Sequence, residues 1–408
     1  MKKENKLTVS SLLFVLLMLI SSATAQESNR WTTAEQREAF ATKVKGFEDC
    51  TQCHKFSVEA WKRSSHFKSL ETLNLDKDGK AKAIMKAMGL KGSPASHTSC
   101  AQCHFTDKTT KNENQFTGKN FGPVYGVSCE SCHGASQDWI ELHNKKSFKD
   151  MQDKFGTLKS DAQKKEFLKS VHMSGGLKAP SGDFLKWRND TASKAGMIRP
   201  DMTYALINNC YECHTIGNKD VVNKTADLDE PHAAGSEFEI VSWLSGEVKH
   251  NFKDADPDNP KNKPFTKEEQ RFLFVAGKVL FAEHALRALK DATFPKNEDE
   301  EPTRFYDEMK ARAEIGLSEI TELNEAMEGG VPEIKMISDK IAAIVEKIGD
   351  DKLTKGDITA KSFDGKDIVG FLAEMNKKFL ANSSKNAALS KLDEDYINDI
   401  EPQGSVYK

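Results

Sequence analysis

Four copies of one short pattern account for all eight cysteines in this 408-residue chain. Each copy holds two cysteines separated by two residues, with a histidine directly after the second. The copies are Cys50-Thr-Gln-Cys53-His54, Cys100-Ala-Gln-Cys103-His104, Cys129-Glu-Ser-Cys132-His133 and Cys210-Tyr-Glu-Cys213-His214. This is the attachment signature of c-type haem, because two thiols add across the haem vinyl groups and the adjacent histidine binds the iron. The sequence therefore predicts four covalently attached c-type haems.

Zinc sites and disulfide frameworks also use paired cysteines, so they are the alternatives to haem. Zinc sites do not need a histidine directly after every pair, and disulfides need no histidine at all. Histidine makes up only 11 of the 408 residues. Its fourfold recurrence at this position would be a roughly one-in-a-million coincidence, which favours haem attachment.

The remaining histidines are candidate sixth ligands for the four irons. They are His66, His97, His143, His172, His232, His250 and His284. Six of them lie within the haem-bearing stretch, and this concentration predicts mostly bis-histidine haems. Methionine would raise the reduction potential as a ligand, but helical cores use methionine routinely, so histidine is the preferred interpretation.

The order and spacing of these groups resemble the tetrahaem cytochrome c-554 family, whose founding activity is to accept electrons from hydroxylamine oxidoreductase. The resemblance covers roughly residues 47–214. Besides the four motifs, it rests on Trp61-Lys-Arg-Ser-Ser-His66 after the first motif and on His143 after the third. It implies that distal ligands are exchanged between haems. The implied ligands are His66 for the haem on His133, His143 for the haem on His54, and His172 for the haem on His214.

The resemblance also implies an open distal face on the haem of His104, but this chain departs from the family. It is much longer and has additional histidines at positions 97, 232 and 250. Any of them could close that haem or replace His172 on the fourth one. His97 lies so close to Cys100 that a neighbouring haem or the surface is its expected place.

The N-terminus is typical of an export signal. Lysines precede a short apolar run, Leu12–Ile20, and an Ala-x-Ala site follows it. Residues 1–25 are therefore predicted to be a signal peptide that is cleaved after Ala25. Export together with haem attachment predicts a periplasmic protein.

The rest of the chain is predicted to be mainly α. Residues 26–253 are expected to form a loop-rich tetrahaem cytochrome c domain, residues 254–264 a linker, and residues 265–408 a helical C-terminal domain. Apolar residues recur at helical spacing in this last part and predict a small bundle. They are Phe272, Val275, Val279, Ala282, Leu286 and Leu289, then Met309, Ala313, Ile320, Leu323 and Met327, then Ile334, Ile337, Ile341, Ile344 and Ile348, and finally Ile368, Phe371, Met375 and Phe379.

This bundle is expected to support the haem domain, with partner docking or oligomerisation as the functional alternative. His284 lies off the apolar face, so it is expected to be exposed.

Four haems attached within one short stretch predict an electron carrier between a periplasmic donor and acceptor. The alternative is a haem enzyme that oxidises or reduces a small nitrogen-oxide-type molecule at a five-coordinate haem on His104. Such an enzyme needs proton donors beside the open face, and the sequence identifies none, so no catalytic residue is predicted. The small net charge of −3 gives no basis for nucleic-acid binding.

Overall fold

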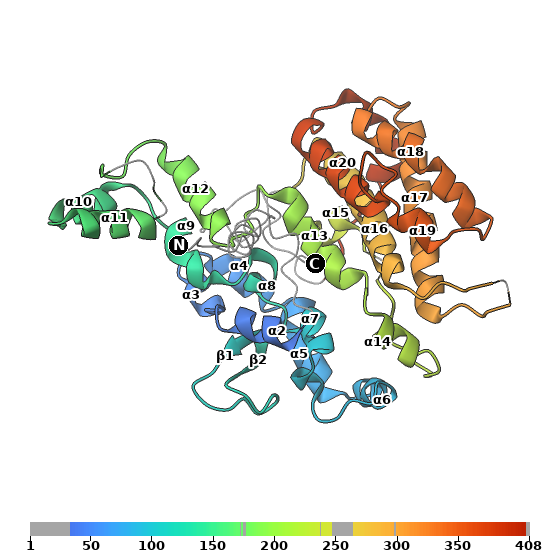
Figure 1. Ribbon diagram of the computed structural model, residues 1–408, viewed down its shortest axis with the longest axis horizontal. Helices are drawn as coiled ribbons and strands as arrows, with labels where there is room; N and C mark the ends of the chain where they lie inside the picture. The colour runs from blue at the N-terminus through green and yellow to red at the C-terminus, as the bar shows by residue number, and fades with distance from the viewer. Residues whose placement is uncertain are drawn as a thin grey trace, which may run out of the picture.

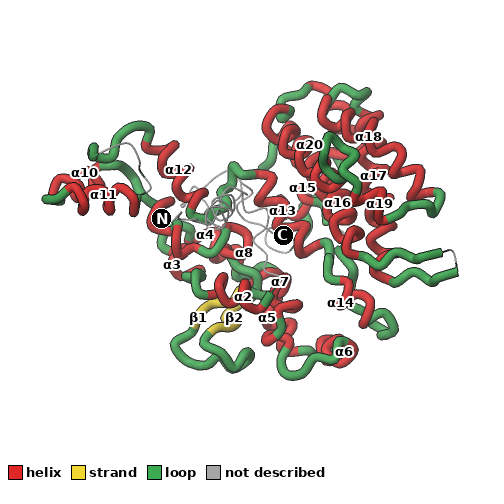
Figure 2. Tube along the Cα trace, in the orientation of Figure 1, coloured by secondary structure: helices red, strands yellow, loops and turns green. Residues whose placement is uncertain are grey.

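The computed structural model describes residues 33–171, 173, 177–236, 238–246, 264–297 and 299–404. The predicted signal peptide, most of the predicted linker, His172 and His250 lie outside these residues. The described part is mainly helical, which confirms the predicted fold class, and its sheet is a single hairpin (Figure 2). No helix in the described part is long and apolar enough to span a membrane.

The N-terminal part consists of short helices around the hairpin. They are α2 (Ala34–Ala41), α3 (Phe47–Thr51), α4 (Lys55–Trp61), α5 (Ser65–Leu75), α6 (Lys80–Ala87), η1 (Pro94–Ser96), α7 (Thr98–His104), α8 (Cys129–His133), η2 (Ser136–Asp138) and α9 (Ile140–His143). Strand β1 (Thr106–Thr109) pairs antiparallel with β2 (Phe121–Tyr125). Beyond this part, Figure 1 shows α10 (Lys149–Thr157) and α11 (Asp161–Ser170) at one end of the molecule, followed by α12 (Phe184–Lys194).

The C-terminal helices lie at the opposite end of the long axis, with α13 (Thr203–His214) between the two ends (Figure 1). The helices after α13 are α14 (Lys219–Lys224), α15 (Ile240–Gly246), α16 (Lys267–Asp291), α17 (Arg304–Ala326), α18 (Pro332–Gly349), α19 (Lys355–Thr359), α20 (Ile368–Asn382), η3 (Ala387–Leu392) and η4 (Asp393–Ile397). Thr266 and Glu269 form a capping box at the start of α16, and Thr303 caps α17.

Helix α16 is the centre of the C-terminal half. It packs against α17 and α20 of the bundle and also against α13 and α15. The apolar residues predicted to face the bundle are buried, apart from the partly buried Phe272. The expectation that His284 is exposed is wrong, since it is only 4% exposed. Its side of α16 faces α13, where His284 Nε2 lies 2.9 Å from Asn208 Oδ1.

The hydrophobic core continues across the predicted linker. Ile207 and Tyr211 of α13 and Ile240 of α15 belong to the same apolar cluster as the bundle. By packing, these helices belong with the C-terminal half, although the sequence assigns them to the haem domain. The fourth haem motif, at the end of α13, is therefore built onto the bundle.

The N-terminal part has a much smaller apolar core of its own, formed by Leu70, Ala95, Ala101 and Phe105. A buried ion pair helps to hold it, because Arg37 Nε lies 2.6 Å from Asp107 Oδ2 and the guanidinium also donates to the Ala95 carbonyl. Burial raises the pKa of Asp107, and the ion pair opposes this effect. A core this small fits a domain in which cofactors supply much of the buried apolar surface.

The close approach of α16 and α17 at Gly316 gives a test of the bundle. A Cβ at Gly316 would lie 2.9 Å from Ala282 Cα and Cβ. We expect Gly316→Val to lower the free energy of unfolding by about 1–3 kcal/mol, because the helices must separate. Gly349→Ala is the control, since its Cβ would meet nothing within 4 Å. Urea unfolding followed by circular dichroism measures both variants, and equal stabilities would contradict the packing described.

Candidate haem sites

Each Cys-x-x-Cys-His motif lies at the C-terminal end of a helix. Helices α7, α8 and α13 end at His104, His133 and His214. The first motif begins at Cys50, inside the last turn of α3, and continues that turn, because the His54 N–H donates to the Cys50 carbonyl at 2.9 Å. Residues i, i+3 and i+4 share one helix face. Each motif therefore presents both thiols and its imidazole on one side, as covalent haem attachment requires.

The motifs contact one another in the order first, third, fourth and second. The thiols of Cys50 and Cys129 are neighbours, and the contact with Cys129 lowers the pKa of Cys50. Asn209, next to the fourth motif, donates through Nδ2 to the Cys132 carbonyl at 2.9 Å. Finally, the Cys213 thiol lies 3.5 Å from the Gln102 carbonyl within the second motif. The four attachment points thus form one continuous chain of neighbours.

Four of the candidate ligands have their Nδ1 atoms held by hydrogen bonds. Three of the partners are carbonyl oxygens, which can only accept, so in those three cases Nδ1 carries the proton and Nε2 keeps its lone pair. Metal-binding histidines are oriented in this way. The bonds join His133 to the Ile198 carbonyl (2.8 Å), His143 to the Ile140 carbonyl (2.7 Å), His232 to the Ala233 carbonyl (2.8 Å) and His214 to the Ser236 hydroxyl (2.6 Å).

In two pairs of histidines from distant segments of the chain, the two imidazole rings of the pair lie opposite each other. The ring centroids of His66 and His214 are 6.5 Å apart, and those of His104 and His232 are 6.3 Å apart. With a metal–imidazole bond of about 2 Å and a ring radius of roughly 1 Å, two axial ligands place their centroids about 6 Å apart. Both pairs therefore fit the two axial positions of a haem iron.

Comparison with known proteins finds one family that is similar to part of the chain. The family model described as "Cytochrome c554 and c-prime" matches residues 49–134, which contain the first three motifs. Over 120 residues the chain is 31% identical to cytochrome c-554 of Nitrosomonas europaea. The match covers 28% of this chain and 47% of that relative, so it spans about half of the relative's length. These matches support a c-type cytochrome that is similar, over this part of the chain, to the cytochrome c-554 family.

No solved structure matches this cytochrome. A c-type cytochrome carries covalently bound haem, and the side chains at the four motifs fit that group. None of the eight cysteines forms a disulfide. Within the described part of the chain, no group of three or more His, Cys, Asp or Glu side chains could hold a bare metal ion.

The resemblance implies His66 for the haem on His133, and that pairing stays a prediction. In the structure the His66 ring lies opposite His214 of the fourth motif. The reason is the packing of α5, which begins at Ser65 and lies against α7. Ser69 of α5 donates to the His104 carbonyl at 2.6 Å, so this helix is held near the second and fourth motifs. His172, implied as the ligand opposite His214, lies outside the described residues.

His143 lies near the first motif, as the resemblance implies. Burial lowers the pKa of His54, and the nearby His143 lowers it further. Both imidazoles also lower the pKa of His133, although burial is the main cause there. The three rings are therefore neighbours, and the pairing of His143 with the haem on His54 stays a prediction.

Two other histidines use their Nε2 atoms elsewhere. His97 Nε2 lies 2.8 Å from the Lys91 carbonyl, and His284 Nε2 bonds to Asn208. Burial lowers the pKa of His284 to about 3. Burial, with a smaller effect of His232, lowers the pKa of His104 to about 4, so this imidazole is neutral and able to bind a metal.

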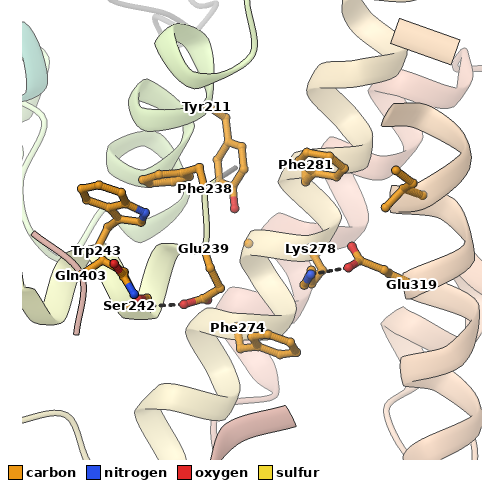
Figure 3. A pocket seen from close by; sticks show the side chains of 12 residues that line it. Tyr211, Phe238, Glu239, Ser242, Trp243, Phe274, Lys278, Phe281, Glu319 and Gln403 are labelled. Carbon is orange, nitrogen blue, oxygen red and sulfur yellow. Dashed lines mark hydrogen bonds and ion pairs between the residues drawn. The ribbon is translucent and has the colours of Figure 1, made fainter. Parts of the chain in front are cut away.

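Phe238 stacks on the proximal histidine of the fourth motif, with its ring centroid 4.3 Å from that of His214. Phe238 also lines a cleft of about 560 Å³ between α15 and α16 (Figure 3). Figure 3 shows Phe238 between Tyr211 and Trp243 on one wall, with Lys278 on the other. The motif spacing could not predict this aromatic packing, because Phe238 lies beyond the last cysteine.

Glu130, inside the third motif, links that motif to the chain that leads into the first. Its buried carboxylate accepts the N–H groups of Lys45 (3.0 Å), Gly46 (2.8 Å) and Ser136 (2.8 Å), and also the Ser136 hydroxyl (2.6 Å). A variable position between two cysteines gives no sequence signal for such a role. The bonds become visible only when the two segments meet.

We expect Glu130→Gln to lower the free energy of unfolding of the haem-loaded protein by about 2 kcal/mol. The amide has one accepting oxygen, and its NH2 group would face backbone donors. Glu141→Gln on α9 is the control, because this side chain is exposed and should change stability by less than about 0.5 kcal/mol. Urea unfolding compares the two variants, and equal effects would contradict a structural role for Glu130.

Proposed function

We propose that this chain is a periplasmic electron carrier with four c-type haems, one on each motif, and mostly bis-histidine ligation. When bound, each haem iron accepts and releases one electron, at a potential that its ligands set. The pairing of His104 with His232 is the observation that carries the proposal. In this pairing His232 would occupy the distal side of the haem on His104. The alternative function, a haem enzyme, needs that side to be open.

The chain of neighbouring motifs supports a role in conduction. The motifs meet in the order first, third, fourth and second, so each haem has an adjacent one for electron transfer. The first and second motifs are the ends of this chain. We infer that one end receives electrons from a redox protein and that the other passes them to an acceptor.

His232 is well placed to serve the haem on His104. Its Nδ1–H donates to the Ala233 carbonyl, which leaves Nε2 for the iron. His97, the nearer alternative in sequence, bonds to Lys91 instead. Closure by His232 would leave no distal face for a small nitrogen-oxide-type substrate.

The haem on His133 takes its second ligand from the remaining histidines in this proposal. His66 faces His214 and His143 is assigned to His54, so His172 and His250 remain as candidates. Both lie outside the described residues. Export by the predicted signal peptide would bring the protein to the periplasm, where its donor and acceptor proteins would be found.

We expect the oxidised protein to show only low-spin haem in electron paramagnetic resonance and the reduced protein to bind no carbon monoxide. His232→Ala should make one haem of the four high-spin and able to bind one carbon monoxide per chain, because His104 then has no partner. Mass spectrometry should count four haems.

His97→Ala is the matched control and should leave the spectrum unchanged, because its ring bonds to a backbone carbonyl. A high-spin, carbon monoxide-binding haem in the native protein would contradict the closed second haem and favour the enzyme. A chain with fewer than four haems would contradict the tetrahaem assignment.

A further inference from the structure

The segment of residues 232–236 serves two haem sites. His232, at its start, faces His104, and Ser236, at its end, bonds to His214 Nδ1. Backbone bonds attach the segment to the end of the fourth motif. The Ser236 N–H donates to the His214 carbonyl, and the Ile216 N–H to the Ala234 carbonyl, both at 2.9 Å.

The outer side of this segment is held by α17 of the C-terminal bundle. Arg304, the first residue of α17, donates through Nη1 to the His232 carbonyl at 3.0 Å and to the Val222 carbonyl at 3.4 Å. The adjacent Phe305 N–H donates to Asn223 Oδ1 at 2.8 Å. The start of α17 is thus attached to both the loop and α14.

Arg312 contacts the other end of the segment. Its Nη1 lies 3.5 Å from the Ser236 carbonyl, and its guanidinium packs on Gly235, where a Cβ would lie 2.4 Å from the guanidinium carbon. Phe281 of α16 packs against the same guanidinium, whose central carbon lies 5.8 Å from the centroid of the Phe281 ring. Glycine at position 235 therefore permits an approach that a larger residue would block.

The spacing of the two arginines matches the segment that they hold. Arg304 and Arg312 are eight positions apart on α17, a rise of about 12 Å. His232 and Ser236 are four positions apart, so their separation is at most about 13 Å, the reach of an extended chain. One face of α17 can therefore contact both ends of the segment at the same time.

We propose that the C-terminal helical bundle positions haem ligands, through Arg304 and Arg312 acting as a clamp on residues 232–236. This inference rests on the proposed function, because it takes His232 as the sixth ligand of the haem on His104. Arg304 is a positioning residue that acts through the His232 carbonyl. Releasing it lets the loop withdraw His232 and opens the second haem.

The test is ligand binding by the complete haem-loaded protein. We expect reduced Arg304→Ala to bind carbon monoxide at one haem per chain, whereas the native protein binds none, because the charge-assisted hydrogen bond that holds the His232 carbonyl is lost. Arg304→Lys keeps the charge but lacks the guanidinium whose Nη1 reaches both carbonyls, so it should give intermediate carbon monoxide binding. Oxidised Arg304→Ala should show a matching high-spin fraction.

Lys310→Ala is the matched control on the same helix. Lys310 pairs with the exposed Asp351, and its side chain is about as buried as that of Arg304, so this variant should stay low-spin and inert to carbon monoxide. In a His232→Ala background, adding Arg304→Ala should change carbon monoxide affinity by less than about twofold, because the positioned ligand is already gone.

Three results would overturn the clamp. They are an Arg304→Ala protein that is low-spin and inert to carbon monoxide, an equal effect from Lys310→Ala, and a full Arg304 effect without His232. In each case a native protein with only low-spin haem leaves the proposed function intact. A native protein that already binds carbon monoxide would instead refute the closed second haem. If Arg304→Ala does not fold, carbon monoxide binding by Arg304→Lys is compared with that by Lys310→Ala, and equal binding overturns the clamp.

Discussion

Pairing of imidazoles from distant segments is the constraint on which the haem-bearing half depends. His66 comes from the start of α5 and His214 from the end of α13, yet their rings face each other at the separation of two axial ligands. His104 and His232 form a second such pair. A metal–imidazole bond tolerates only small errors in ligand position. The short helices and loops around these rings must therefore be held in place by other contacts.

Those contacts come from two different sources. In the N-terminal part they are polar and buried, as in the Arg37–Asp107 ion pair and the four bonds to Glu130. Toward the C-terminus they are apolar, because α13 packs onto the central helix α16. The fourth motif thus belongs to the haem chain by chemistry and to the bundle by packing. This shared position explains how a bundle with no haem motif of its own can affect haem ligation.

The limits of sequence reasoning are clearest for the histidines. The motifs show which histidines are proximal, because spacing along one helical turn decides that role. Distal roles depend on which segments meet, and the packing of α5 against α7 puts His66 opposite His214, a contact that no spacing predicts. His284 was misjudged for a similar reason, since helical period shows only one apolar face and α16 is covered on several sides. His232 gave no signal beyond being a histidine.

The sequence by itself determined the attachment chemistry, the mainly helical fold and the apolar faces of the bundle. Each is a local property, read from spacing within one turn or one helix. Only the tertiary structure decided that His66 faces His214, that His232 faces His104, and that Arg304 holds the His232 carbonyl. These contacts join segments far apart in the chain. Their geometry follows from how whole helices pack, and no local pattern encodes it.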